Sequence, residues 1–249
     1  MPSSPASSSS VTTRCLGCGR DFETEQVVLL GQTFAAERYC ELCRVGEQVN
    51  EEQRRAEARW RRVLVPPSYR NCTFESFEPV PDTRTALNVC RQWAKEYRAG
   101  TALRQGLLLR GAPGAGKTHL AVAILREIVW DDDPPSALFL NVPGWLNALR
   151  ESFGDGEAPP SPSGYEVIVL DDLGAEDWTS WARDRIYSLV NQREQESRLT
   201  IVTTNCTWGE LAGRVGGPTA SRLRRLTREV HVDARQDFRD VLAQIAADG

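Results

Sequence analysis

One segment, Gly111-Ala-Pro-Gly-Ala-Gly-Lys117-Thr118, constrains the fold of this chain more than any other. It matches the pattern G-x-x-x-x-G-K-S/T and lies between an apolar run at residues 106–110 and a helix expected at 117–129. In such a loop, glycines let backbone N–H groups approach phosphate, the lysine pairs with the β- and γ-phosphates, and the threonine hydroxyl binds Mg²⁺. The sequence therefore predicts a site for ATP and Mg²⁺ at Gly111, Pro113, Gly114, Ala115, Gly116, Lys117, Thr118 and His119.

Apolar strand-like runs alternate with helical segments through this part of the chain. Beyond residues 106–129, strands are expected at 137–142, 167–170, 199–203 and 230–232, and helices at 144–153, at 179–196 and at the C-terminus. Alternation of this kind predicts an α/β fold in which helices cover both faces of a parallel sheet.

Polar residues follow two of the expected strands. Asp171 and Asp172 come directly after residues 167–170, and Asn205 follows residues 199–203 and Thr204. Because parallel strands end at the same edge of a sheet, these side chains should lie beside the glycine loop. We expect Asp171 to bind Mg²⁺, Asp172 to orient or deprotonate the attacking water, and Asn205 to hold the γ-phosphate and that water. Alternatively, Asp171 and Asp172 could simply form an acidic turn, and Asn205 could be an ordinary polar residue at the end of a strand, with no role in function.

Two C-x-x-C pairs lie near the N-terminus, with 21 residues between them. Each pair can direct two thiolates at one ion, and two pairs complete a tetrahedral shell around Zn²⁺. Four thiolates leave no open coordination position, so the metal should support the fold and take no part in catalysis. A redox pair and a chance cluster are the alternatives, but no βαβ pattern surrounds either pair. The expected ligands are Cys15, Cys18, Cys40 and Cys43.

Composition and local sequence divide the chain into four parts. Residues 1–14 are expected to be a disordered tail, 15–45 the zinc-binding module, 46–64 a connecting helix and 65–249 the nucleotide-binding domain. The net charge is −4, so no overall basic field indicates a nucleic-acid-binding protein. No apolar run approaches the ~20 residues that span a bilayer, and the first residues lack the features of a secretory signal. We expect a cytoplasmic protein that does not contact membranes.

The combination of motifs resembles AAA+ ATPases of the DnaC/IstB group, which contains helicase loaders and transposition helper ATPases. The resemblance begins at Val65-Pro-Pro-Ser-Tyr-Arg70, continues through the glycine loop and the Asp171-Asp172 pair, and ends near Asp237-Phe-Arg239. It implies the strand order 5-1-4-3-2 and self-association through the ATP site. In that arrangement Arg222 would be an arginine finger for the neighbouring subunit, and Arg239 would contact nucleotide in its own subunit. Most AAA+ proteins have Glu where this chain has Asp172, so we expect slow hydrolysis.

The N-terminal cysteine module resembles the helicase-binding domain of DnaI-type loaders. This resemblance implies an ATP-dependent helicase loader for DNA replication, which binds a hexameric DnaB-type helicase through the zinc module and assembles on single-stranded DNA. Trp145, Arg150 and Phe153 are candidate DNA contacts, although aromatic residues at helical spacing more often belong to a core. The alternatives are an IstB-like transposition helper and an ATP-binding adaptor with little hydrolysis.

Overall fold

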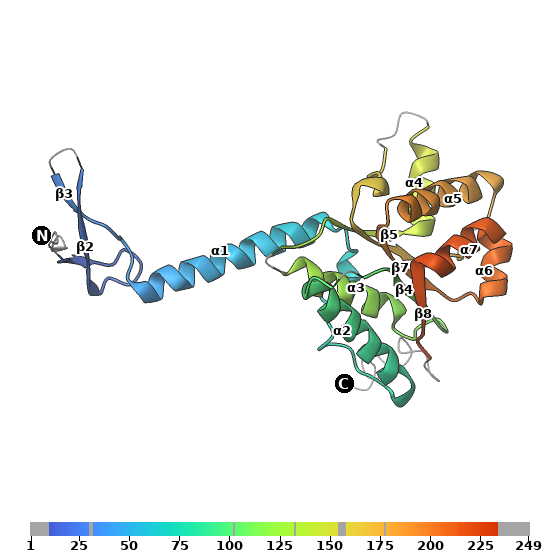
Figure 1. The fold of residues 1–249 in the computed structure, drawn as a ribbon, viewed down its shortest axis with the longest axis horizontal. Helices are drawn as coiled ribbons and strands as arrows, with labels where there is room; N and C mark the ends of the chain where they lie inside the picture. The colour runs from blue at the N-terminus through green and yellow to red at the C-terminus, as the bar shows by residue number, and fades with distance from the viewer. Residues whose placement is uncertain are drawn as a thin grey trace, which may run out of the picture. The chain divides into compact units, whose positions relative to one another are not determined.

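The computed structural model describes residues 10–29, 32–101, 103–131, 133–153, 158–176 and 178–233. The chain forms two compact units, Met1–Glu57 and Ala58–Gly249, which we describe separately (Figure 1). Across the described residues, every helix is too short or too polar to span a membrane.

The first unit contains an antiparallel sheet of three strands, β1 (Ser10–Arg14), β2 (Asp21–Leu29) and β3 (Gln32–Ala35), in that order. Helix α1 (Glu41–Arg62) follows and contains the boundary between the two units. Very little of this unit is a hydrophobic core. Among its described residues, only Cys15 and Ala56 are buried apolar side chains.

Two sequence-based boundaries in this unit are wrong. The expected tail at 1–14 is too long, because residues 10–14 pair with β2 along their whole length. The consecutive β-branched residues Val11, Thr12 and Thr13 of β1 favour a strand, although the serine-rich sequence before them does not. The connecting helix begins at Glu41 and not at residue 46, although Gly46 in its second turn is a poor helix former.

The second unit is built on a parallel sheet of five strands. They are β4 (Gly106–Arg110), β5 (Ala137–Asn141), β6 (Val167–Asp171), β7 (Leu199–Thr204) and β8 (Thr227–His231). Their order is β5-β6-β7-β4-β8, and every neighbouring pair is parallel. Counted from the first strand of this sheet, the order is 5-1-4-3-2 read from the β8 edge, which confirms the expected topology.

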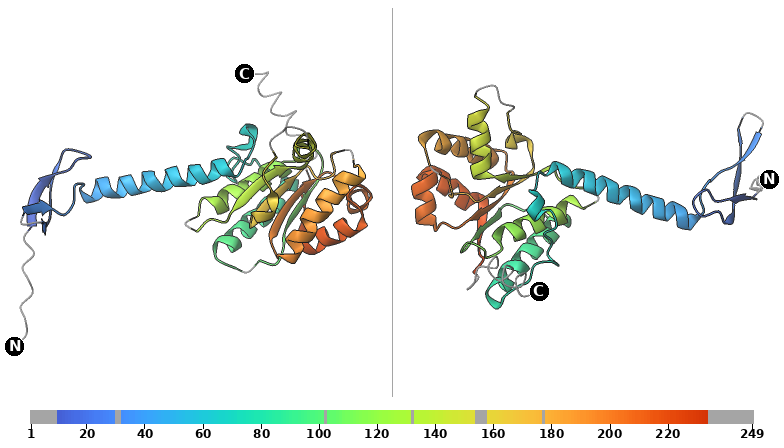
Figure 2. Two further views of the ribbon diagram at one scale, coloured as in Figure 1. Left: turned by 90° about the horizontal axis from the view of Figure 1, so that it is seen from above. Right: turned by 180° about the vertical axis from the view of Figure 1, so that it is seen from behind.

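Helices cover both faces of this sheet (Figure 2). Alternate side chains of β4 enter different cores. Leu107 and Leu109 pack on one face with the helices at residues 84–98 and 117–129. Leu108 packs on the other face with the four helices that follow residue 141. The short 3₁₀ turns are Pro67–Tyr69, Pro81–Thr83 and Pro162–Gly164. The helices after α1 are α2 (Arg84–Arg98), α3 (Lys117–Val129), α4 (Val142–Glu151), α5 (Ser180–Gln195), α6 (Trp208–Val215) and α7 (Gly217–Leu226). The expected C-terminal helix and Arg239 lie outside the described residues.

A buried arginine fixes the strand ends opposite the nucleotide loop. Arg193 of α5 is fully buried, and its Nε donates a hydrogen bond to Thr200 Oγ1 at 2.9 Å. Its two terminal nitrogens donate to the carbonyl oxygens of Tyr165 and Glu166, which precede β6, and of Leu199, the first residue of β7. Burial lowers the pKa of Arg193 to about 10, so the guanidinium stays charged at neutral pH. Its donors satisfy backbone carbonyls that would otherwise be buried without partners.

Candidate functional site

The glycine loop joins β4 directly to α3, which begins at Lys117. Gly116 has a backbone φ of +90°, and a Cβ atom there would lie 2.6 Å from Cε2 of Phe77. Any other residue at 116 would therefore be strained and would also collide with a buried ring. The loop therefore packs closely against Phe77 at the point where α3 begins.

The loop forms one wall of a cavity of about 520 Å³. The opposite wall comes from residues between Ser68 and Thr83, and Asp172 and Asn205 reach the same cavity from the strand ends. Among the predicted phosphate-site residues, Gly111 does not line the cavity. A Cβ atom there would lie 1.9 Å from the Val232 carbonyl oxygen, so Gly111 serves the close packing of the backbone. The residues that line the cavity as expected are Pro113, Gly114, Ala115, Gly116, Lys117, Thr118 and His119.

Lys117 and Thr118 occupy the first turn of α3. Lys117 is only 5% exposed, and its Nζ donates a hydrogen bond to the Ala112 carbonyl oxygen at 2.7 Å, which keeps the ammonium group inside the loop. Thr118 Oγ1 donates to Asp171 Oδ1 at 2.8 Å. An octahedral Mg²⁺ ion places neighbouring oxygen ligands about 2.9 Å apart, so this hydroxyl and carboxylate fit the ion well.

Asp171 is buried, and Thr203 Oγ1 also donates to its Oδ1, at 2.7 Å. Burial raises the pKa of Asp171, and the hydrogen bonds from Thr203 and Thr118 act against that rise. Sequence reasoning missed Thr203. The two threonines before Asn205 were the available signal, but their spacing does not show that the first of them points at Asp171.

Asp172 has a backbone φ of +56°, a left-handed conformation that Asp tolerates better than most residues. Its N–H donates to Thr203 Oγ1 at 2.9 Å, so the same threonine holds both carboxylate residues. Asp172 and Asn205 line the cavity together, as the sequence predicted. The arrangement can bind the phosphates at the loop, a Mg²⁺ ion at Thr118 and Asp171, and a water molecule near Asp172 and Asn205.

Arg222 lies on α7 and does not line this cavity. Its Nε contacts Asn191 Oδ1 at 3.1 Å and Glu194 Oε2 at 3.2 Å, and its guanidinium lies over the ring of Tyr187 at 4.9 Å. These three partners belong to α5 of the same chain. The structure thus places Arg222 on a helical surface, away from the nucleotide site of its own subunit.

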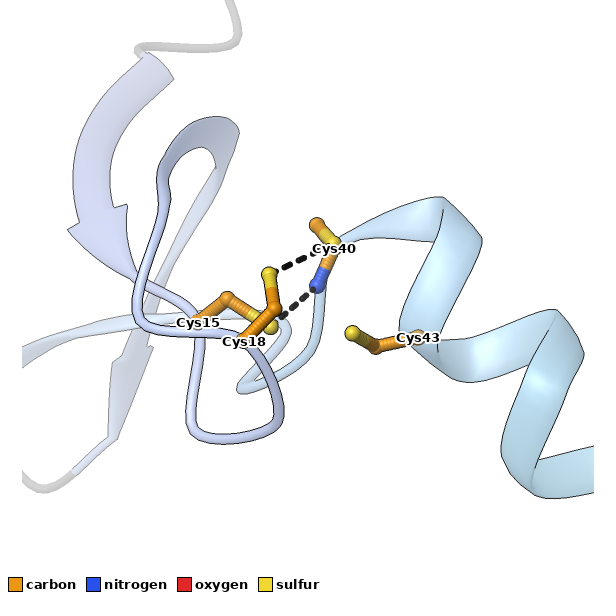
Figure 3. Close-up of side chains that lie close together, drawn as sticks. All are labelled: Cys15, Cys18, Cys40 and Cys43. Carbon is orange, nitrogen blue, oxygen red and sulfur yellow. Dashed lines mark hydrogen bonds between the residues drawn. The ribbon is translucent and has the colours of Figure 1, made fainter.

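The four N-terminal cysteines come together as a candidate metal centre (Figure 3). All four sulfur atoms lie within 4.8 Å of one another, and the Sγ atoms of Cys18 and Cys40 are 3.8 Å apart. A tetrahedral Zn²⁺ ion with Zn–S bonds of about 2.3 Å has sulfur–sulfur edges of about 3.8 Å. The cysteines are free thiols, and Cys43 lies in the first turn of α1.

Local hydrogen bonds prepare this centre for a cation. The Cys40 N–H donates to Cys15 Sγ at 3.2 Å and lowers the pKa of Cys15 to about 6. Arg20 Nε donates to Cys18 Sγ at 3.4 Å and lowers the pKa of Cys18. The neighbouring sulfurs, Cys18 first, raise the pKa of Cys43 to about 12. The four sulfur atoms therefore form a site that could hold a divalent cation such as Zn²⁺.

Comparison with known proteins identifies a family to which this sequence is similar. The family of IstB-like ATP binding proteins matches residues 32–236, which include all the residues named above as lining the cavity. The chain belongs to that family. ATP binding and an ATPase-type activity follow from this membership, and the cavity between the glycine loop and residues 68–83 is where the IstB-like chain would hold the nucleotide.

Two curated relatives are replicative helicase loaders. The chain is 25% identical to replicative helicase loader DnaC of Escherichia coli K12 over 166 residues, 64% of this chain and 66% of that protein. It is 26% identical to replicative helicase loader DnaI of Bacillus subtilis 168 over 191 residues, 75% of this chain and 60% of that protein. A crystal structure of the DnaC helicase loader matches with a TM-score of 0.58 and 25% identity, over 67% of this chain and 99% of that one.

Replacing Lys117 should remove nucleotide binding. We expect Lys117→Ala to weaken affinity for a fluorescent ATP analogue at least about thirty-fold, because a charge-assisted hydrogen bond contributes about 2 kcal/mol. The matched control is Lys95→Ala, since Lys95 is the other lysine of the chain and lies on α2, outside the cavity. Equal affinity of the two variants would contradict the assignment of the phosphate site.

Proposed function

We propose that this chain is an ATP-dependent helicase loader that binds a hexameric DnaB-type replicative helicase through its N-terminal unit. The observation that carries the proposal is the pairing of an IstB-like nucleotide cavity with a four-cysteine centre in a unit of its own. ATP would control assembly on single-stranded DNA. The similarity to the helicase loaders DnaC and DnaI supports this function over other uses of the same ATPase fold.

The N-terminal unit carries an apolar surface suited to a protein partner. On α1, Leu42, Val45 and Val49 are exposed at a spacing that places them on one helical face. Among the described residues, seven of the ten exposed large apolar side chains belong to this unit, although it is the smaller one. Exposed apolar groups at this density indicate a binding surface. The seven are Leu16, Val27, Val28, Phe34, Leu42, Val45 and Val49.

Zinc and helicase binding should be lost together. We expect Cys40→Ser to lower the zinc content per chain and to abolish co-purification with the host's replicative helicase, measured as mass in solution. ATP affinity should stay unchanged, because the nucleotide cavity lies in the other unit. Cys72→Ser is the control for zinc content, since Cys72 lies outside the four-cysteine cluster. A helicase complex that persists in the zinc-free variant would contradict the proposed role of the module.

An aromatic and cationic patch on α4 and α5 supports binding of single-stranded DNA. Phe153 is 70% exposed, and its ring centroid lies 6.2 Å from that of Trp181. Arg150 and Arg185 lie over the Trp181 ring at 5.0 and 5.6 Å. Bases stack on such rings while arginines attract the phosphates. Trp145 is half-buried against the core beneath α4, and Trp181 packs against the same core.

Removing this platform should weaken DNA binding selectively. We expect Trp181→Ala to reduce affinity for a fluorescent oligothymidylate about ten-fold, in line with the loss of one stacked base. Trp208→Ala is a matched control, because Trp208 also lies beneath an arginine, Arg224 at 4.8 Å, but on α6. An equal loss in both variants, or no loss in either, would refute DNA binding at the patch.

We assign slow ATP hydrolysis between subunits to Asp172, Asn205 and Arg222, with Arg239 as a further nucleotide contact. The Asp172 side chain is one methylene shorter than Glu, so its hold on the attacking water is less direct. Arg222 would act on a neighbouring subunit, which agrees with its distance from the cavity of its own chain. This role requires the chains to associate through the ATP site.

Arg222→Ala should lower the steady-state rate of ATP hydrolysis at least about a hundred-fold while ATP affinity is retained. Arg225→Ala is the control, because Arg225 lies on the same helix and contacts the same Glu194, at 2.6 Å. Mixing Arg222→Ala with Lys117→Ala chains should restore activity, since each supplies what the other lacks. Full hydrolysis by a monomeric Arg222→Ala chain would exclude an arginine finger.

The second candidate function is an IstB-like transposition helper, which is compatible with membership of the IstB-like family. The same ATPase would then mark target DNA for a transposase. If wild-type protein forms no complex with the helicase with or without ATP, but binds a transposase encoded beside it, this function replaces helicase loading. An ATP-binding adaptor would instead show no hydrolysis in a single-turnover assay.

A further inference from the structure

The nucleotide cavity has a second wall, which is formed by residues outside the phosphate loop. The loop provides one side of the cavity, and Ser68, Tyr69, Cys72, Ser76 and Phe77 provide part of the other. These residues precede the sheet in the chain and belong to none of its strands. Since phosphates bind at the loop, this second wall faces the space left for the base and the sugar.

His119 connects the two walls. It lies on the first turn of α3, two residues after Lys117, and its Nε2 is 2.8 Å from the Thr73 carbonyl oxygen. A carbonyl can only accept a hydrogen bond, so Nε2 carries a proton and donates it. The same nitrogen lies 3.3 Å from Ser76 Oγ, within the turn that Thr73 and Ser76 form through their own hydrogen bonds.

The imidazole ring also holds Phe77. The two rings meet edge to face with centroids 5.2 Å apart, and Phe77 in turn packs where Gly116 leaves room. Phe77 is buried in the same core as Ala115 of the glycine loop. One side chain of α3 therefore contacts both the backbone and the buried ring of the second wall.

A second contact lies further along α3. Arg126 donates from Nη1 to the Arg70 carbonyl oxygen at 2.8 Å. Residues 119 and 126 are seven positions apart and lie on one face of the helix. The helix that binds phosphate at its N-terminus thus holds the second wall at two points, and His119 is the one beside the cavity.

We propose that His119 is a positioning residue for the nucleotide, which holds residues 73–77 against α3 and so sets the space that receives the base and the sugar. The phosphates would not need this contact, because the loop and Lys117 form their site without it. His119 should therefore affect affinity for ATP and leave affinity for inorganic tripolyphosphate unchanged. This inference concerns the cavity alone and requires neither a helicase nor DNA.

The test compares His119→Phe, which keeps a ring but loses the donor, with the pair His119→Gln and His119→Asn. Gln can place an N–H group near the position of Nε2, whereas the shorter Asn cannot. We expect His119→Phe and His119→Asn to bind ATP about ten-fold more weakly than wild type, and His119→Gln to stay within about three-fold. His231→Gln is the control, because His231 is the other histidine of the chain and lies on β8.

Two further measurements separate positioning from general damage. Isothermal titration with tripolyphosphate should give the same affinity for all variants, and hydrogen exchange should speed up in peptides covering residues 71–78 but not in peptides of α3. The Gln and Asn pair keeps the test valid if His119→Phe does not fold. Equal ATP affinity of Gln and Asn variants, or a parallel loss for ATP and tripolyphosphate, would overturn the proposal.

Discussion

The hydrogen bonds to Asp171 hold the phosphate loop and the central strands in one arrangement. A carboxylate buried at the end of β6 needs partners, and it finds them in Thr118 of α3 and Thr203 of β7. Three elements distant in the chain therefore meet at one oxygen atom. Because Thr203 also accepts the N–H of Asp172, the group expected to orient water is fixed by the same contact. Any shift of β7 relative to α3 would disturb metal binding and water positioning together.

The two units solve the problem of stability differently. The second unit has a sheet with a hydrophobic core on each face. It also buries the charged side chain of Arg193, which is stabilised by hydrogen bonds to backbone carbonyl oxygens. The first unit buries almost no apolar side chains among its described residues and gathers four thiols instead. A metal can supply the stabilisation that a small unit lacks, and its apolar side chains stay available for a partner. The proposed division of labour between helicase binding and ATP binding rests on this difference.

Much of the nucleotide site could be predicted because its chemistry is local. The glycine loop, the strand before it and the helix after it are adjacent in the sequence, and the polar residues after β6 and β7 follow from the geometry of parallel strands. The cysteine pairs were also visible from spacing alone. In contrast, helix α2 was missed although its apolar positions repeat at helical spacing, and the tail prediction obscured β1, whose strand pattern is short and polar.

The type of fold could be predicted from the sequence, and a phosphate site could be proposed at the glycine loop, because both depend on short patterns with strong conformational and chemical preferences. The tertiary structure alone decided which side chains complete the site. Thr203 lies 32 residues from Asp171, and His119 lies 46 residues from Thr73, yet each pair is joined by a hydrogen bond. It likewise brought Trp181 of α5 beside Phe153, which follows α4 in the chain. Such pairings depend on how helices pack across the sheet, and the residue pattern within a single segment does not predict that packing.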